Sequence, residues 1–157
     1  KDLNNYNYNY CLSSWVFIHQ QTLATSKHST KPSSLLNFDY KPDILFDVSK
    51  NKLVINVQKT DIPTTYKKET DIPLQKWNNI VINYTGGTLD IFINSKLISS
   101  EQIIIKDMKK DLHNVTIGTD GGVSGGVCNV TYFPRPLTLP EISILYESLK
   151  LRSPPIV

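Results

Sequence analysis

The sequence has few cysteines and no long apolar runs. Its 157 residues include only two cysteines, Cys11 and Cys128, which stand far apart without the neighbouring histidines or further cysteines of a zinc site. The longest apolar stretches, such as 103–105, are far shorter than the roughly 20 residues of a membrane-spanning helix. The sequence therefore predicts neither a zinc-stabilised fold nor membrane insertion of this segment.

The sequence also lacks a large excess of charge of either sign. Lys and Arg exceed Asp and Glu by 17 to 14, a net charge of +3. So small an excess does not predict a nucleic-acid partner, which requires a strongly basic face. The lysines Lys67-Lys68 and Lys106 with Lys109-Lys110 are candidates for a patch that binds sulfated glycans or an anionic surface. Solvated loop charge is the favoured interpretation of both groups.

No methionine and no apolar leader open the sequence at Lys1, so we expect a segment of a longer protein or a processed form. Residues 1–9 are interpreted as a linker or run-in, residues 10–151 as one domain and residues 152–157 as a tail. A domain of this size buries roughly two-thirds of the surface its unfolded chain exposes, so it needs neither a metal nor a disulfide to fold.

Short strands are what the chain has in abundance. Their expected positions are 10–18, 34–38, 43–48, 52–58, 77–84, 88–94, 96–99, 113–118 and 127–133. The clearest pair flanks Gly86-Gly87, because glycines take the positive φ angles of a tight hairpin turn. Three segments rich in polar residues or glycine, at 19–34, 59–75 and 119–126, are expected as loops.

One short helix is expected at the C-terminal end. Thr138 suits the N-cap, Glu141 the reciprocal position of a capping box, and Pro140 the first turn. Four apolar residues then recur at helical spacing: Ile142, Leu145, Tyr146 and Leu149. Together these elements predict an all-β fold, a two-sheet antiparallel jelly-roll sandwich with one short C-terminal helix.

Three parts of the sequence resemble concanavalin A-like, laminin-G-like domains. They are the opening strand Leu12–Ile18, the hairpin formed by Trp77–Tyr84 and Leu89–Leu97, and the closing segment from Gly125 to Tyr146. The Asn- and Lys-rich composition resembles that of such domains in proteins of large DNA viruses of protists. The resemblance implies a module for recognition or assembly, on a virion surface or in an extracellular or membrane-attached protein.

Catalysis is not expected from this resemblance. Enzymes of this fold are β-glucanases, which need two carboxylates across one glycosidic bond, close together on one strand. No Glu-x-Asp-x-Glu arrangement occurs, and the strand 89–93 carries only Asp90. The expected function is a non-catalytic module that binds a glycan or protein through rim loops. The alternative is a purely structural component of a virus particle without a glycan ligand, and glycoside hydrolysis ranks third.

The site residues remain open at this point. The resemblance implies calcium in a rim loop, with Asp120 as the best ligand and Asn114 or Asp90 as helpers, although Asp120-Gly121 also suits a plain turn. No other cofactor is expected. The candidates for ligand binding are Asp120, Tyr66, Tyr132 and His28, with Tyr6, Tyr8 and His19 as further aromatic residues near loops. Trp15 and Trp77 are assigned to the core because they lie in apolar strands.

The resemblance also bears on the cysteines, because the first and last strands of this fold pair side by side. Strict alternation places Cys11 and Cys128 on the face that carries Trp15 and Tyr132. They are expected either as a disulfide or as two buried thiols. The glycosylation sequons at Asn83, Asn114 and Asn129 are interpreted as chance matches in an Asn-rich chain.

Overall fold

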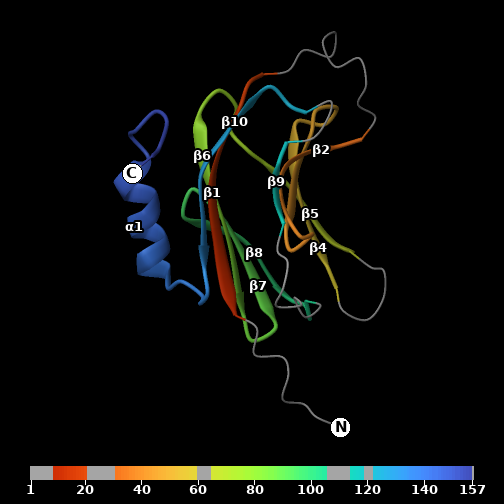
Figure 1. Cartoon of the computed structure of the whole chain (residues 1–157), viewed down its shortest axis with the longest axis vertical. Coiled ribbons are helices and arrows are strands. Elements are labelled where there is room, and N and C mark those ends of the chain that lie inside the picture. The colour runs from red at the N-terminus through yellow and green to blue at the C-terminus, as the bar shows by residue number, and fades with distance from the viewer. Residues whose placement is uncertain (1–8, 21–30, 60–64, 106–113, 119–121, 157) are drawn as a thin grey trace.

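The fold is a sandwich of two five-stranded antiparallel sheets with one helix outside it, which confirms the predicted fold class (Figure 1). The computed structural model describes residues 9–20, 31–59, 65–105, 114–118 and 122–156. Sheet A has, in spatial order, β10 (Gly125–Phe133), β1 (Tyr10–Ile18), β6 (Trp77–Thr85), β7 (Thr88–Ile93) and β8 (Lys96–Gln102). Sheet B has β5 (Thr65–Asp71), β4 (Lys52–Gln58), β3 (Asp43–Asp47), β2 (Ser33–Phe38) and β9 (Val115–Ile117).

The main core lies between the two sheets, where alternate residues of each strand meet. The residues that sheet A contributes include Leu12, Val16, Ile80, Ile82, Leu89 and Ile91, and sheet B contributes Leu36, Ile44, Phe46, Leu53 and Ile55. The predicted hairpin is confirmed: Gly86 and Gly87 take positive φ angles between β6 and β7. The alternation predicted for 52–58 is also observed, since Leu53, Ile55 and Val57 are buried in this core.

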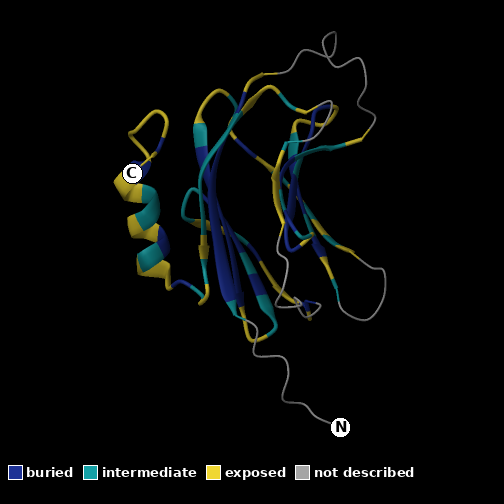
Figure 2. Ribbon diagram, in the orientation of Figure 1, coloured by how far each residue is buried: buried dark blue, intermediate teal, exposed yellow. Residues whose placement is uncertain are grey.

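Sheet A is buried on its second face as well, because helix α1 (Leu139–Leu149) packs against it (Figure 2). Ile142 of the helix joins a cluster with Cys11 and Val81 of the sheet. Trp15 is only 2% exposed and stacks on Tyr146 of the helix, with ring centroids 5.8 Å apart. The central strand β1 is therefore apolar on both faces, as its sequence predicts. No helix in the described residues is long and apolar enough to span a membrane.

A pair of amide hydrogen bonds fixes the chain segment that leads into α1. The side-chain nitrogen of Asn83 donates to the carbonyl of Leu137 at 3.0 Å, and the backbone N–H of Leu137 donates to Asn83 Oδ1 at 2.8 Å. Asn83 is buried in β6, so both polar ends of its amide need partners. This exchange satisfies them and sets where the helix begins.

The predicted capping box begins the helix. Thr138 donates to Glu141 from its backbone N–H at 2.8 Å and from its hydroxyl at 2.9 Å. Arg135 adds a two-pronged contact to the same carboxylate, at 2.6 and 3.2 Å. The hydrogen bond from Arg135, followed by those from Thr138, lowers the pKa of Glu141 from its ordinary 4.5 to about 2.

The segment predicted as one loop at 59–75 contains a strand, so that prediction was wrong. Residues 65–71 form β5, which pairs with β4 along its full length. The signal was missed because β5 is an edge strand whose outward side chains are polar, and only Tyr66 supplies a large apolar group. Lysines and acids along such an edge are common, because they discourage pairing with another chain.

Asn129 forms a β-bulge that changes the alternation of β10. Its φ is +48°, and residues 129 and 130 together face Ser14 of β1. Strict alternation placed Tyr132 on the same face as Trp15, and this was wrong. After the bulge, Tyr132 turns to the inner face, where its ring packs against the aromatic residues of the core.

The two cysteines are free thiols, so the disulfide that was one of two expectations does not form. In the register of β1 and β10, Cys11 faces Phe133 whereas Cys128 faces Trp15. The two thiols are therefore several residues apart along neighbouring strands, although a bridge requires close Cα atoms. The other tryptophan, Trp77, is only partly buried, in an edge-to-face contact with Phe17, so its assignment to the core was also wrong.

The capping box generates a prediction about pH. Because the folded pKa of Glu141 is depressed, its charge stabilises the fold above about pH 4.5, and this contribution disappears as the pH falls toward about 2. Glu141→Gln should therefore unfold at a lower temperature than the wild type at neutral pH, and the gap should close in acid. Thermal unfolding followed by circular dichroism across this range measures it. Glu147→Gln, near the other end of α1, is the control, and a gap independent of pH would contradict the assignment.

The free thiols generate a second prediction. Burial raises the pKa of the Cys11 thiol to about 12, so its reactive thiolate is scarce, whereas Cys128 is only partly buried. Iodoacetamide should label Cys128 before Cys11 in the native protein, and label both in denaturant without reductant. Peptide mass spectrometry locates the labels, with Cys128→Ser as the control. A denatured chain that takes up no label would mean that the cysteines are bonded after all.

Candidate functional site

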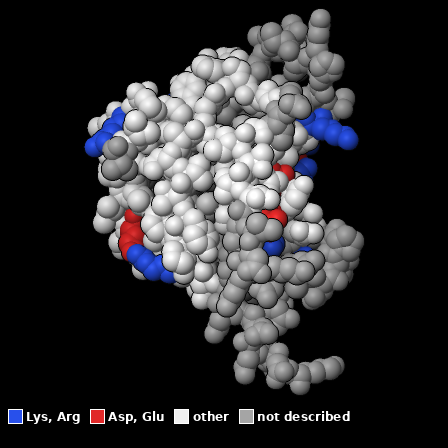
Figure 3. All heavy atoms as spheres, viewed as in Figure 1, with Lys and Arg blue, Asp and Glu red and all other residues white. Residues whose placement is uncertain are grey.

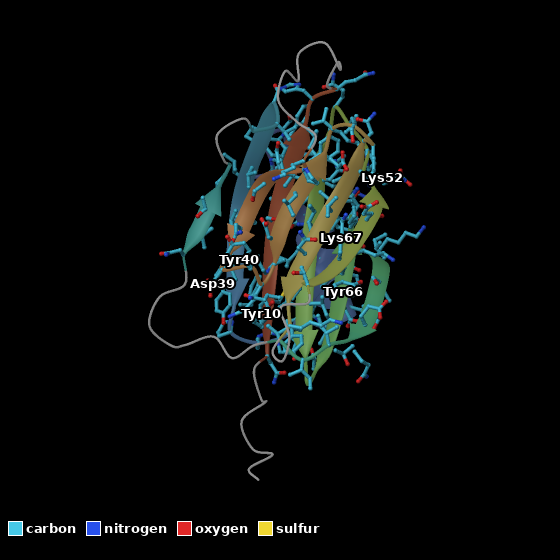
Figure 4. The ribbon with its side chains drawn as sticks, turned by 90° about the vertical axis from the view of Figure 1, so that its right-hand side faces the viewer. Tyr10, Asp39, Tyr40, Lys52, Tyr66 and Lys67 are labelled. Atoms are coloured by element: carbon cyan, nitrogen blue, oxygen red, sulfur yellow. The ribbon has the colours of Figure 1, made fainter. Side chains whose placement is uncertain are left out.

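A hollow with polar walls lies on the outer face of sheet B, and we call it the sheet B pocket. Its volume is about 360 Å³, and it is lined by Tyr40, Asp43, Asn56, Gln58 and Thr65. Figure 4 faces this sheet and shows Tyr40 near one end of it, with Lys52 toward the other. No described helix covers this face, since α1 lies against sheet A.

Strand register brings the lining residues together. Ile44 and Ile55 point into the core, so their neighbours Asp43 and Asn56 point outward, and these two face each other across β3 and β4. Gln58 faces Thr65 across β4 and β5 in the same way. Side chains from three strands thus form one wall, although they lie far apart in the sequence.

Asp43 is a buried carboxylate in this wall, with only 8% of its surface exposed. The hydroxyl of Ser34 donates to its Oδ1 at 2.8 Å. Burial raises the pKa of the Asp43 carboxyl above its ordinary value, and hydrogen bonds from Ser34 and Asn37 partly offset that rise. The carboxylate is therefore held in a fixed position at a cost in solvation, which is a common feature of binding sites.

Tyr40 stands at the mouth of the pocket on a tight turn. The backbone N–H of Lys41 donates to the carbonyl of Phe38 at 2.8 Å, and the two central residues, Asp39 and Tyr40, have φ angles of +47° and +57°. Turns with two positive φ angles normally use Asn-Gly or similar pairs. A tyrosine in this conformation is strained, and such strain is typical of functional sites.

The backbone around Tyr40 fixes its position while its ring faces solvent. Its N–H donates to Asn37 Oδ1 at 2.9 Å, and its carbonyl accepts the N–H of Gln58 at 3.0 Å. The side chain is nevertheless 60% exposed. An exposed ring on a rigid support can bind an apolar ligand face with little loss of conformational entropy.

Asn56 in the pocket wall has an unmet hydrogen-bonding requirement. Its Oδ1 is buried and has no hydrogen-bond partner among the described residues. Leaving a buried acceptor unpaired costs about 1–3 kcal/mol, so proteins rarely retain one without a water or ligand to complete it. The acceptor lies beside Asp43 in the register.

Three lysines on or beside sheet B, namely Lys50, Lys52 and Lys67, lie close to carboxylates. Lys67 Nζ lies 2.6 Å from a Glu69 oxygen, Lys50 Nζ lies 3.3 Å from the same atom, and Lys52 Nζ lies 2.6 Å from Asp71. The face shown in Figure 3 likewise has no large cluster of described Lys and Arg. The other predicted basic group, at 106–110, lies outside the described residues.

The predicted site residues do not form one cluster. Tyr66 links the two sheets, because its hydroxyl lies 3.0 Å from the Ser99 hydroxyl of β8 and its ring packs against the main core. Tyr132 is 41% exposed and stacks on Tyr10, with centroids 6.2 Å apart, at the β10 side of the sandwich. Asp120 and His28 lie outside the described residues, as do residues 21–30 and 60–64 of the predicted rim loops.

A smaller hollow, of about 150 Å³, adjoins the described part of the glycine-rich loop. Its lining is mostly apolar or glycine and includes Leu35, Ile117, Gly118, Val123 and Gly126. Among the described residues, no group of three or more His, Cys, Asp or Glu side chains is placed to hold a metal ion. The calcium site expected at Asp120 stays a prediction.

The sequence analysis missed the residues of the sheet B pocket. The outward positions of 43–47 and 52–58 include Asp43, Asn56 and Gln58, but polar outward residues are also typical of a plain solvent-facing sheet, so they do not indicate a site by themselves. The strained tyrosine gave no signal, because Asp-Tyr is not a known turn pair. Only the strand register shows that these residues share a wall.

Comparisons with known proteins agree with this architecture. The family model described as Concanavalin A-like lectin/glucanases superfamily matches residues 1–143. No curated protein sequence matches the chain.

Solved structures share the fold at low sequence identity. The binding domain of Paraclostridial Mosquitocidal Protein 1 has a TM-score of 0.72 at 15% identity, and the match covers 91% of this chain and 38% of that domain. The receptor binding domain of botulinum neurotoxin mosaic serotype C/D has a TM-score of 0.69 at 18% identity, and the match covers 94% of this chain and 38% of that domain. Trypanosoma rangeli sialidase has a TM-score of 0.61 at 16% identity, and the match covers 92% of this chain and 23% of the sialidase. The chain thus spans less than half the length of each.

The strained turn generates a prediction about stability. Glycine takes positive φ without the steric cost of a side chain, so Tyr40→Gly should leave the free energy of unfolding unchanged or raise it by about 1 kcal/mol. Urea unfolding measures this, with Tyr40→Ala as the control that keeps a side chain in the strained position. A clear loss of stability in Tyr40→Gly would mean that the tyrosine ring serves the fold.

Proposed function

The chain belongs to the Concanavalin A-like lectin/glucanases superfamily, and from that premise we propose that it is a non-catalytic recognition module that binds a glycan in the sheet B pocket. The observation that carries the proposal is the strained, exposed Tyr40 beside the buried carboxylate of Asp43. Sugar sites combine these two features, an aromatic ring for the C–H face of a pyranose and fixed polar groups for its hydroxyls.

The rest of the pocket fits this role. Asn56, Gln58 and Thr65 supply amide and hydroxyl groups around the carboxylate, and all of them sit on paired strands. A site on paired strands keeps its geometry better than one on free loops. This refines the expectation of rim loops: the ligand contacts one end of sheet B and the turn between β2 and β3.

A binding role accounts for the pocket better than glycoside hydrolysis does. Hydrolysis uses two carboxyl groups roughly 5 to 10 Å apart on either side of the bond. Among the described residues, Asp43 is the one carboxylate that lines the pocket. Two of the similar structures are named as binding or receptor binding domains, which supports the same role, whereas one is named as a sialidase.

Assembly without a glycan is the second candidate function. Three large apolar side chains in and after α1 are exposed, namely Leu139, Ile144 and Leu151, and such residues suit contact with another protein. We also propose a place on the surface of a virion or of an extracellular or membrane-attached protein. The support for this location is the resemblance of the Asn- and Lys-rich strands to domains of large DNA viruses of protists.

A glycan array with purified wild type, Tyr40→Ala and Lys52→Ala tests the proposed function. The wild type should bind a defined set of glycans, and loss of the Tyr40 ring should weaken binding by about tenfold or more. Lys52→Ala, on the same sheet but outside the pocket lining, should bind like the wild type because it removes only an exposed ion pair.

The same array run with calcium and with chelator tests the calcium expectation at Asp120. Loss of binding in chelator would support a metal-bridged contact there. A wild type that binds nothing in either condition would contradict the glycan proposal and favour assembly.

A further inference from the structure

We infer that the sheet B pocket selects saccharides without acidic groups: it binds neutral sugar hydroxyls and disfavours uronic, sialic and sulfated sugars. The inference rests on the proposed function, because it names the class of glycan that the same pocket takes. It is argued from the charges and hydrogen-bond acceptors in and around the pocket.

The pocket wall offers fixed oxygen acceptors. The Asp43 carboxylate already accepts from Ser34 and Asn37, which hold it in place, and its remaining acceptor capacity faces a ligand that can donate. Asn56 adds an amide oxygen that has no partner among the described residues. Sugar hydroxyls can donate to such acceptors, whereas carboxylate and sulfate groups at neutral pH only accept.

No cation in the described lining offsets the carboxylate. Two described lysines close to the pocket in sequence or register have anionic partners: Lys41 Nζ lies 3.5 Å from Asp39, and Lys67, which faces Asn56 across β4 and β5, has its Nζ 2.6 Å from Glu69. The lining contributed by β4 and β5 is neutral, as Gln58 and Thr65 show. An anionic sugar would therefore approach a buried negative charge without compensation.

The repulsion between Asp43 and an acidic sugar is large enough to give clear selection against acidic glycans rather than a mild preference for neutral ones. Two like charges about 4 Å apart at a partly buried site repel strongly even at an effective dielectric constant of about 20. A mobile surface charge could turn away, but Asp43 is fixed by its hydrogen bonds and by burial. We expect matched acidic and neutral glycans to differ by at least about tenfold in affinity.

Matched glycan pairs test the inference. Each pair shares one oligosaccharide backbone, with and without a uronic, sialic or sulfate group, and is measured against wild type, Asp43→Asn and Lys52→Glu. The wild type should prefer the neutral member by about tenfold or more, and Asp43→Asn should bring the ratio close to one. Lys52→Glu, which adds negative charge to the same sheet outside the pocket, should keep the wild-type ratio.

The outcomes separate this inference from the proposed function. A wild type that binds acidic members as tightly as neutral ones overturns the inference and leaves the glycan function standing. Binding to no glycan overturns both. An unchanged ratio in Asp43→Asn, or an equal change in Lys52→Glu, overturns the inference because the selection would then arise elsewhere. Since burial disfavours the charged form of Asp43, the Asn variant should fold at least as stably as the wild type, and unfolding checks this.

Discussion

The burial of sheet A on both faces is the constraint on which the rest of the molecule depends. Sheet B covers one face and helix α1 covers the other, so its central strands need apolar residues in both directions. Polar groups in these strands must find partners inside the protein. Asn83 does so fully by exchanging hydrogen bonds with Leu137. Asn79 does so in part: its amide nitrogen donates to Ser13 and Ser14, but its Oδ1 has no partner among the described residues. The same bonds that satisfy buried amides therefore position the helix and hold neighbouring strands together.

Sheet B has the opposite character, and this asymmetry explains where a ligand can bind. Its inner face completes the core, whereas its outer face carries polar side chains that the fold does not need. The strained Tyr40 and the buried Asp43 lie at this outer face, away from the core between the sheets. In the proposed function, sheet A is the rigid support and sheet B carries the binding residues. This division is common in proteins whose binding residues lie on a stable scaffold.

The fold could be predicted where local chemistry and packing agree. Gly86-Gly87 marks the hairpin, and Thr138 with Glu141 marks the helix, because each signal lies within a few residues. Strand β5 escaped because an edge strand needs no apolar alternation. The bulge at Asn129 escaped because one extra residue reverses every later side chain without changing composition. The pocket escaped for a third reason: its residues meet only through the register of three strands and the turn that carries Tyr40.

The position of β1 between β6 and β10 also governs how the chain reaches this structure. Among the described strands of this domain, β1 leaves the ribosome first, and the partner for one of its edges, β10, leaves it last. Contacts so distant in sequence form slowly, because a long loop must close before they bring any stabilisation. Until β10 emerges, an apolar strand edge stays open to pairing with other chains or to capture by chaperones. Sheet A can therefore close only after β10 has been synthesised, and a domain truncated before β10 would be prone to aggregation.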